Sequence, residues 1–529
     1  MISLFKNTAL AALAATALLA SCKKGPEVNI LATGNFGGDT TTALKDAADF
    51  PIGVAVNYTP LNDAQFANVV KRDFDAVTFG YEMKHGAIVQ NNGTYNFTQA
   101  DAMMTAVNGM TVFGHTLGWH QNQNATYLKN YAGITLPAAV ELLPSNGGFE
   151  NGLNGWSTFN TNGATVSANT VASEAHTGSG SMKVVNPTAN AGNQWKVQVS
   201  SAAFNTVPGS QYLISYWVRA AAAGGSIRLS SGPTSAQYQG DQTIGTAWQL
   251  VTWQITANLT STTFLFDMGQ AANTYYIDDV SVKEVIVAPS GSQVTNRVDM
   301  ALGNFITTIV NRYKANVHAW DVVNELFADD GTLRSNANTA NSASDVFVWS
   351  EYLGRDYALK AFNYAKAADP TADLFINDYA LESNARKLDS LIAFVRELKT
   401  RGAKVDGIGT QMHIAWNTPY DGIDKMFQKL AATGLKIRVS ELDVKTVAGS
   451  AAGKPTDQLS AYQAAMVKYV VSSYMKNIPA AQRAGITVWG INDRNSWLYN
   501  NGTEYPLLYD NNYNKKPAYA AFLQALKGQ

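Results

Sequence analysis

Residues 319–327 read AWDVVNELF, an apolar, β-branched run that stops at the polar pair Asn324-Glu325. Runs of this kind are typical of a parallel strand buried on both faces. A second stretch, IRVSELD at residues 437–443, has the same form and carries Glu441. Barrel folds build their sites at the C-terminal ends of parallel strands. Two strands far apart in the sequence are therefore expected to bring two glutamates to one site.

Around these two stretches, short apolar strands alternate with segments of helical periodicity, which is typical of a parallel sheet or barrel. The predicted strands are 51–56, 74–79, 111–117, 317–325, 374–379, 405–413, 437–444 and 485–493. The predicted helices are 61–72, 98–108, 298–313, 345–368, 384–401, 420–433, 457–475 and 517–526. Eight strands, each with a helix after it, predict an α/β fold of the (β/α)₈ TIM-barrel type.

The alternation stops at about residue 143 and resumes near residue 295. Between these points the chain is rich in Gly, Ser, Thr and Asn and carries short alternating stretches such as 211–218. Many short strands separated by turn residues predict an antiparallel β-sandwich. We therefore predict a barrel in two parts, 29–142 and 287–529, interrupted by an inserted sandwich at 143–286.

The composition narrows the class of protein. With 529 residues, 46% of them hydrophobic and 15% charged, the chain is expected to form a packed globular protein of two to four domains. A net charge of −1 and the absence of a long basic run argue against nucleic acid as a partner. The 11 Trp and 24 Tyr suit sugar-stacking surfaces, but aromatic residues also fill ordinary cores.

The N-terminus has the form of a processed leader. Lys6 precedes an apolar segment, 8–20, that is short for a membrane span and ends in Leu19-Ala20-Ser21-Cys22. This resembles a bacterial lipoprotein signal, with Cys22 lipidated after removal of the leader and 23–28 as a tether. The expected location is a bacterial membrane, facing the periplasm or the cell surface. The alternative is a leftover thiol in an ordinary signal peptide.

Glu325 and Glu441 end the fourth and seventh predicted strands and so face each other across the barrel mouth. Two carboxylates are what glycoside hydrolysis requires, one to protonate the leaving oxygen and one to attack or to activate water. A separation of roughly 5 Å would indicate a retaining mechanism. Either glutamate alone could instead be a structural ion-pair partner.

Polar and aromatic side chains are expected beside the two glutamates. Asn324 can hydrogen-bond a sugar 2-hydroxyl, and His413 can orient Glu441 and keep it ionised. Any single Trp could instead be core packing. The remaining candidates for the mouth are Lys84, His115, Trp119, Gln411, Trp489 and Trp497.

The histidines do not indicate a catalytic metal. His115, His120 and His413 lack the local spacing of zinc ligands, and the chain has no HExxH motif. It also has no G-x-S-x-G elbow and no Gly-rich phosphate loop after a strand. No cofactor is expected for catalysis.

Taken together, the motifs resemble those of glycoside hydrolase family 10, the endo-β-1,4-xylanases. They are Gly114–Leu117 with Trp119-His120, Trp320–Glu325, Asn377–Tyr379, Gln411 with His413, Ser440–Asp443, and Trp489-Gly490 with Asp493, Ser496 and Trp497. The resemblance implies that Glu325 is the acid/base and Glu441 the nucleophile. It also implies that the glycone subsites are formed by Lys84, His115, Trp119, Asn324, Gln411, His413, Trp489 and Trp497.

One part of the family pattern is missing. Directly before the sequence Glu-Met-Lys, here residues 82–84, the family usually has a Glu-Asn pair that grips the second sugar upstream. This chain has Gly80-Tyr81 there, and it has Asn122 where a glutamine is usual. The upstream subsites are therefore expected to be weaker or differently shaped.

The predicted insert is similar to carbohydrate-binding modules of the family 4/22 type, on the motifs 146–152, 155–156, 176–178 and 276–280. Trp195 and Tyr238 are the candidates for stacking on a glycan chain, and Trp156 is expected in the core. The resemblance also suggests a structural calcium ion near Glu150 and Asp278 or Asp279, although such acids could equally be solvated.

The sequence thus predicts a membrane-anchored, monomeric, retaining endo-1,4-β-xylanase that acts on xylan or xylo-oligosaccharides. One alternative is a barrel glycosidase for another β-glucan, which the Gly80-Tyr81 change keeps open. The other alternative is a surface glycan-binding lipoprotein whose barrel is inactive.

Overall fold

The computed structural model describes residues 36, 40–144, 146–446, 456–499 and 501–529. These residues form two compact units. One contains the described residues up to Ala132 together with Gly291–Gln529, and the other is Gly133–Ser290. The second unit encloses the predicted insert, 143–286. The predicted leader, the tether and Cys22 lie outside the described residues.

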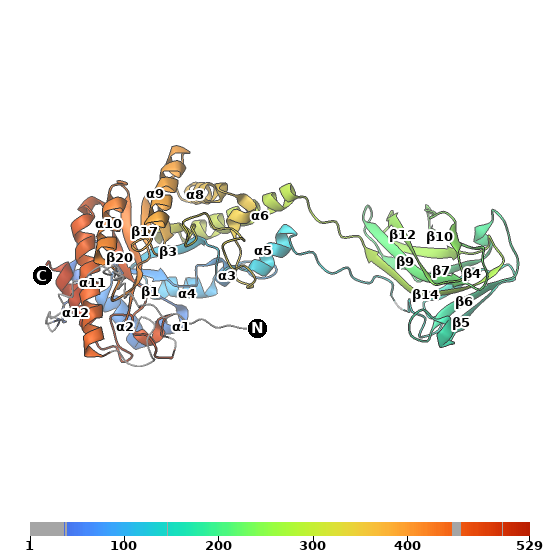
Figure 1. Ribbon diagram of the computed structural model, residues 1–529, viewed down its shortest axis with the longest axis horizontal. Coiled ribbons are helices and arrows are strands. Elements are labelled where there is room, and N and C mark those ends of the chain that lie inside the picture. Colours follow the sequence, from blue (N-terminus) through green and yellow to red (C-terminus); the bar gives the residue numbers. More distant parts are fainter. Residues whose placement is uncertain (1–35, 37–39, 145, 447–455, 500) are drawn as a thin grey trace, which may run out of the picture. The chain divides into compact units, whose positions relative to one another are not determined.

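The first unit is a closed barrel of eight parallel strands with helices around it, as predicted (Figure 1). Strands β1, β2 and β17 are buried at every position, which explains why they carry no charged residue. The β20–β1 pairing closes the ring. In order around the barrel, the strands are β1 (Ile52–Val56), β2 (Ala76–Phe79), β3 (Thr111–Gly118), β15 (Val317–Asn324), β16 (Asp373–Asp378), β17 (Gly407–Thr410), β19 (Lys436–Lys445) and β20 (Arg483–Val488).

The helices of this unit are α1 (Tyr58–Leu61), α2 (Ala64–Asp73), α3 (His85–Ile88), α4 (Thr98–Ala106), α5 (Ala125–Ala132), α6 (Gly291–Tyr313), α7 (Trp349–Leu353), α8 (Asp356–Ala368), α9 (Ala385–Thr400), α10 (Tyr420–Ala431), α11 (Asp457–Asn477) and α12 (Pro517–Leu526). The prediction of one helix over 345–368 is wrong. Gly354, at φ 60°, separates α7 from α8, because a left-handed residue cannot continue an α-helix.

The sixth predicted strand is also divided. β17 ends at Thr410, Met412 adopts φ 62°, and a short strand β18 (His413–Ala415) then pairs with the end of β19. The left-handed residue turns the chain after the barrel strand has ended. His413 is thereby placed alongside the strand that carries Glu441.

The second unit is an antiparallel sandwich of two sheets (Figure 1). Alternate residues of β9 point inward, and Trp156, Tyr216 and Phe266 belong to one buried cluster between the sheets, so the core position expected for Trp156 is confirmed. One sheet is, in order, β12 (Gln249–Thr256), β9 (Gln211–Ala220), β14 (Asn273–Glu284), β6 (Ser181–Asn186) and β5 (Thr165–Asn169). The other is β11 (Gln242–Ile244), β10 (Gly225–Gly232), β13 (Ser261–Asp267), β7 (Gln198–Ser201) and β4 (Trp156–Asn160), with β8 (Phe204–Asn205) paired to β13.

Among the described residues, no helix has both the length and the apolar character needed to cross a bilayer.

Candidate active site

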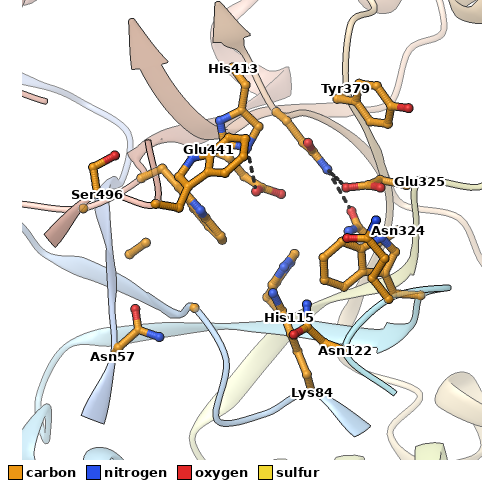
Figure 2. Close-up of a pocket in the computed structure, with 18 of the residues that line it drawn as sticks. Asn57, Lys84, His115, Asn122, Asn324, Glu325, Tyr379, His413, Glu441 and Ser496 are labelled. Carbon is orange, nitrogen blue, oxygen red and sulfur yellow. Dashed lines mark hydrogen bonds and ion pairs between the residues drawn. The ribbon is translucent and has the colours of Figure 1, made fainter. Parts of the chain in front are cut away.

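A cavity of about 780 Å³ lies at the C-terminal ends of the barrel strands. All ten residues predicted for the barrel mouth line it. Figure 2 shows that the carboxylates of Glu325 and Glu441 point toward one another across this pocket. The predicted residues along its wall are Lys84, His115, Trp119, Asn324, Glu325, Gln411, His413, Glu441, Trp489 and Trp497.

Glu325 follows the last residue of β15 in an unusual backbone conformation. Its φ is 53°, which costs a residue with a Cβ roughly 1–3 kcal/mol. Two hydrogen bonds made by its backbone hold Glu325 in this conformation. The N–H of Glu325 donates to the Asn377 carbonyl at 2.8 Å, and Nε of Arg334 donates to the Glu325 carbonyl at 2.7 Å. The turn directs the carboxylate into the cavity instead of along the strand.

Glu441 is buried on β19 and accepts two side-chain hydrogen bonds. The Nδ2 atom of Asn377 donates to Oε1 at 2.7 Å, and Nε2 of His413 lies 3.2 Å from Oε2. Behind His413, Nδ1 lies 2.8 Å from Asp443, which also accepts the indole N–H of Trp497 at 2.9 Å. Asp443 thus fixes the imidazole that orients Glu441.

The electrostatics of this group favour an ionised Glu441. Burial alone would raise its pKa, but the hydrogen bond from His413 and the nearby His115, His413 and Lys84 outweigh burial and lower the pKa to about 2. Burial would lower the pKa of His413, but Asp443 and Glu441 raise it to about 10. We infer an imidazolium–carboxylate pair at neutral pH.

A chain of amide side chains connects the two glutamates. Asn377 bridges Glu441 to Oδ1 of Asn324, at 2.7 and 2.8 Å. Nε2 of Gln411 lies 3.2 Å from the same Asn324 oxygen and 3.1 Å from Oε1 of Glu325. Because each amide has only one oxygen to accept hydrogen bonds, this network fixes which way each side chain faces. The site is therefore set before a substrate binds.

The other predicted residues form the walls of the cavity. Lys84 places its Nζ 4.5 Å from the centre of the Trp119 ring, and burial lowers its pKa to about 8. The Trp489 ring lies edge-on to His115 at 5.4 Å, and Trp497 lies similarly against His413 at 5.1 Å. Cationic, imidazole and indole groups thus surround the carboxylates, which suits a ligand with both hydroxyl groups and apolar C–H faces.

Sequence reasoning did not assign several residues that shape the site. Asn377 and Asp443 stood inside motifs that were recognised, and both lie in the C-terminal halves of barrel strands, β16 and β19, which was a usable signal. Arg334 reaches Glu325 from a loop, and no local pattern predicts that contact. The unassigned residues that line the cavity include Asn57, His120, Arg334, Asn338, Tyr379 and Ser496.

Comparison with known proteins decides the family. The sequence profile of Glycosyl hydrolase family 10 matches residues 41–229 and 286–525. The chain belongs to glycosyl hydrolase family 10. The first matched segment of this family 10 chain extends past Gly133, where the fold changes, and the unmatched residues 230–285 lie inside the sandwich.

The sequences of two curated relatives align with less than half of this chain. Endo-beta-1,4-xylanase Xyn10C of Cellvibrio japonicus is 37% identical over 246 residues, which are 43% of this chain and 40% of that protein. Endo-1,4-beta-xylanase A of C. japonicus strain Ueda107 is 35% identical over 256 residues, 45% of this chain and 42% of that one. The chain thus spans less than half the length of these curated relatives.

A solved structure resembles more of the chain. Native xylanase10C from C. japonicus aligns with a TM-score of 0.57 and 25% identity. The alignment covers 93% of this chain and 75% of that one. It is consistent with the family 10 barrel described above.

In the inserted sandwich, the two predicted stacking residues flank one row of polar side chains. Trp195 is 50% exposed and Tyr238 is 59% exposed. Between them, one residue from each of four neighbouring strands forms a row on the sheet face away from the core. Each residue is paired with the next across the strands, and their side chains are hydrogen-bonded. The row is Arg228, Asp267, Gln198 and Asn160, joined at 2.8, 2.9 and 2.7 Å.

The two ends of this row reach the two aromatic residues. The Arg228 guanidinium lies 4.6 Å from the centre of the Tyr238 ring, and Asn160 donates to the Trp195 carbonyl at 3.1 Å. The row thus ends at the exposed Tyr238 ring on one side and at the backbone of the exposed Trp195 on the other.

The predicted calcium ligands are engaged with the protein itself. Glu150 accepts hydrogen bonds from the N–H groups of Ser179 and Gly180, and Asp278 accepts from His176 and Thr177. The Asp279 carboxylate contacts the same two residues as Asp278 does. Within the described ranges, no three His, Cys, Asp or Glu side chains gather as metal ligands. The calcium ion therefore stays a prediction.

Proposed function

We propose that this family 10 protein is a retaining endo-1,4-β-xylanase, which hydrolyses internal β-1,4 bonds of xylan by double displacement. The observation that carries the proposal is the pair of carboxylates, Glu325 and Glu441, directed into one cavity and tied into one hydrogen-bond network. The printed names of the two C. japonicus relatives add support for xylan as the substrate.

In the first step Glu441 attacks the anomeric carbon of the sugar and Glu325 donates a proton to the departing glycosidic oxygen. The anomeric C–O bond breaks as the ester bond to Glu441 forms. In the second step Glu325 removes a proton from water, the water oxygen bonds to the anomeric carbon, and Glu441 leaves as a carboxylate. Asn324 is placed to bond the sugar 2-hydroxyl, a contact that strengthens in the transition state.

The test is digestion of xylan, cellulose and mixed-linkage β-glucan by the full chain, with chain-length analysis and NMR of the first product anomer. The proposal expects xylo-oligosaccharides of several lengths, released first as the β-anomer. Preferential cleavage of cellulose or β-glucan would establish the other glycosidase, which the Gly80-Tyr81 departure keeps open. Absence of reducing-sugar release from every polysaccharide would establish the inactive glycan-binding protein.

We expect the loss of His413 to move the acidic limb of the activity profile upward. Glu441 must be ionised to attack. Burial raises the pKa of Glu441 and the hydrogen bond from His413 lowers it, so loss of His413 should raise this pKa. In His413→Ala the acidic limb of kcat/KM should therefore rise by roughly one pH unit or more. The measurement is a pH profile on an aryl β-xylobioside whose leaving group needs no proton.

Trp497→Phe is the matched control, because it removes the N–H bond to Asp443 but leaves the contact between His413 and Glu441. Its acidic limb should stay at the wild-type position. An unshifted acidic limb in His413→Ala would contradict the proposed role of the imidazole.

We also propose that the sandwich is a carbohydrate-binding module that holds one xylan chain along the polar row between Trp195 and Tyr238. Stacking on two rings with hydrogen bonds between them suits a sugar chain with hydroxyl edges. Trp195→Ala and Tyr238→Ala, each made in Glu441→Ala to prevent hydrolysis, should weaken binding to insoluble xylan about tenfold, or about 1.4 kcal/mol.

Leu250→Ala is the control for this experiment, because it removes an exposed apolar side chain from the other sheet. It should bind xylan like its parent. If the two aromatic variants also bind like their parent, the proposed glycan surface is refuted.

We further propose that the chain is a monomer anchored to a bacterial membrane through a lipid on Cys22. Cys22 is the single cysteine, and the residues before it have the composition of a lipoprotein signal. In bacterial cells Cys22→Ser should move the protein from the membrane fraction to the soluble fraction. Recovery of this variant in the membrane pellet would contradict the anchor, and light scattering of the purified protein tests the monomer.

A further inference from the structure

Gly80 has no room for a side chain because Asn57 lies against it. A Cβ atom at position 80 would lie 2.8 Å from Oδ1 and 3.0 Å from Nδ2 of Asn57, closer than such atoms normally approach. Both residues line the cavity of the active site. Asn57 can therefore occupy its position only because residue 80 has no side chain.

The side chain of Asn57 does not cap helix α1, although Asn57 occupies the N-cap position of that helix. Asn57 is the residue before α1, where an Asn usually caps the helix and stabilises it by about 1 kcal/mol. Here it makes no capping hydrogen bond, and the residue is exposed. Its amide thus remains available to a ligand in the cavity, where Figure 2 labels it among the residues drawn.

The strand order puts Asn57 between Lys84 and Trp489, two residues that the family resemblance assigns to the upstream subsites. It directly follows β1, which lies between β2 and β20. Lys84 comes after β2 and Trp489 after β20, and both line the cavity beside Glu441. Glu325 comes from β15, which is separated from β1 by two strands on one side and by four on the other.

We propose that Asn57 is a specificity-determining residue that hydrogen-bonds the second sugar upstream of the cleaved bond, with Gly80 retained to make space for it. The inference rests on the proposed function and adds a residue to it. A neutral amide both donates and accepts, whereas a carboxylate at position 80 could only accept. The subsite is therefore rebuilt from the neighbouring strand and not merely lost.

The experiment compares two aryl glycosides, one with a single xylose and one with xylobiose, by the ratio of their kcat/KM values. Only the xylobioside fills the second upstream position. Asn57→Ala should lower the xylobioside-to-xyloside ratio about tenfold, which is near the upper end for one hydrogen bond. An unchanged ratio, whether both kcat/KM values fall equally or neither falls, would overturn the proposal.

The contact with Gly80 is tested by a double-mutant cycle. Gly80→Ala should displace the Asn57 side chain and lower the ratio in the wild-type background. In an Asn57→Gly background the same change should have little further effect, because the atoms it would meet are gone. Equal effects in both backgrounds would refute the coupling, and thermal unfolding of all four proteins checks that each is folded.

The two proposals fail in different ways. If the wild-type protein cleaves neither glycoside and no xylan, the proposed function fails. If it cleaves both but the ratio does not respond to Asn57, only the inference about this subsite fails.

Discussion

Glu441→Ala is expected to lower kcat on xylan by about 10⁵-fold, or about 7 kcal/mol of transition-state stabilisation. The reason is that the variant cannot form the glycosyl ester, so neither step of double displacement can occur. The loss should be equally large on aryl xylobiosides with good leaving groups, because the first step requires attack by Glu441 whatever the leaving group is. Initial rates on both substrates, measured after removal of any wild-type contaminant, check this.

The fold should survive the change. Glu441 makes its side-chain bonds to Asn377 and His413, and Asn377 keeps its partners Asn324 and Ser440 in the variant. Glu397→Ala is the matched control, because Glu397 is on the outer helix α9 and pairs with Arg355. It should retain wild-type turnover. Activity of Glu441→Ala within tenfold of this control would exclude Glu441 as the nucleophile.

The barrel was predictable because its strands are buried on both faces and its helices on one. β16 carries a short apolar run, residues 374–376, β19 alternates apolar with polar residues over 437–440, and α9 and α10 have clear helical periodicity. The errors fall where one residue changes the backbone. Gly354 and Met412 adopt left-handed conformations that interrupt a helix and a strand, and local periodicity carries no signal for either.

The site was predictable to the extent that its residues lie in the C-terminal parts of barrel strands or directly after them. Glu325 directly follows β15, Glu441 lies in the second half of β19, and His413 begins the short strand β18 that pairs with β19; the closure of the barrel brings the three together. Arg334 could not be found in this way, since it reaches the site from a loop. Asn57 also follows a strand, but its importance depends on the empty volume at Gly80, which only coordinates reveal.

Glu325→Ala is expected to produce a loss that depends on the leaving group, unlike Glu441→Ala. On xylan the departing sugar needs a proton, so turnover should fall by roughly 10³- to 10⁴-fold, near the top of the range for general acid catalysis. On a dinitrophenyl xylobioside the leaving group departs unprotonated, so formation of the glycosyl ester should be nearly as fast as in the wild type. The second step then limits turnover, because no base activates water.

Because the glycosyl ester forms quickly and is hydrolysed slowly in Glu325→Ala, the covalent intermediate becomes observable. The xylobiosyl ester on Glu441 should accumulate in Glu325→Ala and appear in the intact-protein mass spectrum after mixing with the dinitrophenyl substrate. Added azide should restore turnover and give a β-xylobiosyl azide, because the anion attacks the anomeric carbon without needing a base and Glu441 leaves as a carboxylate. Backbone strain cannot account for the result, because alanine at φ 53° carries the same Cβ as glutamate and Arg334 still bonds the backbone carbonyl. Equal losses on xylan and on the dinitrophenyl substrate, with no ester detected, would exclude Glu325 as the acid/base.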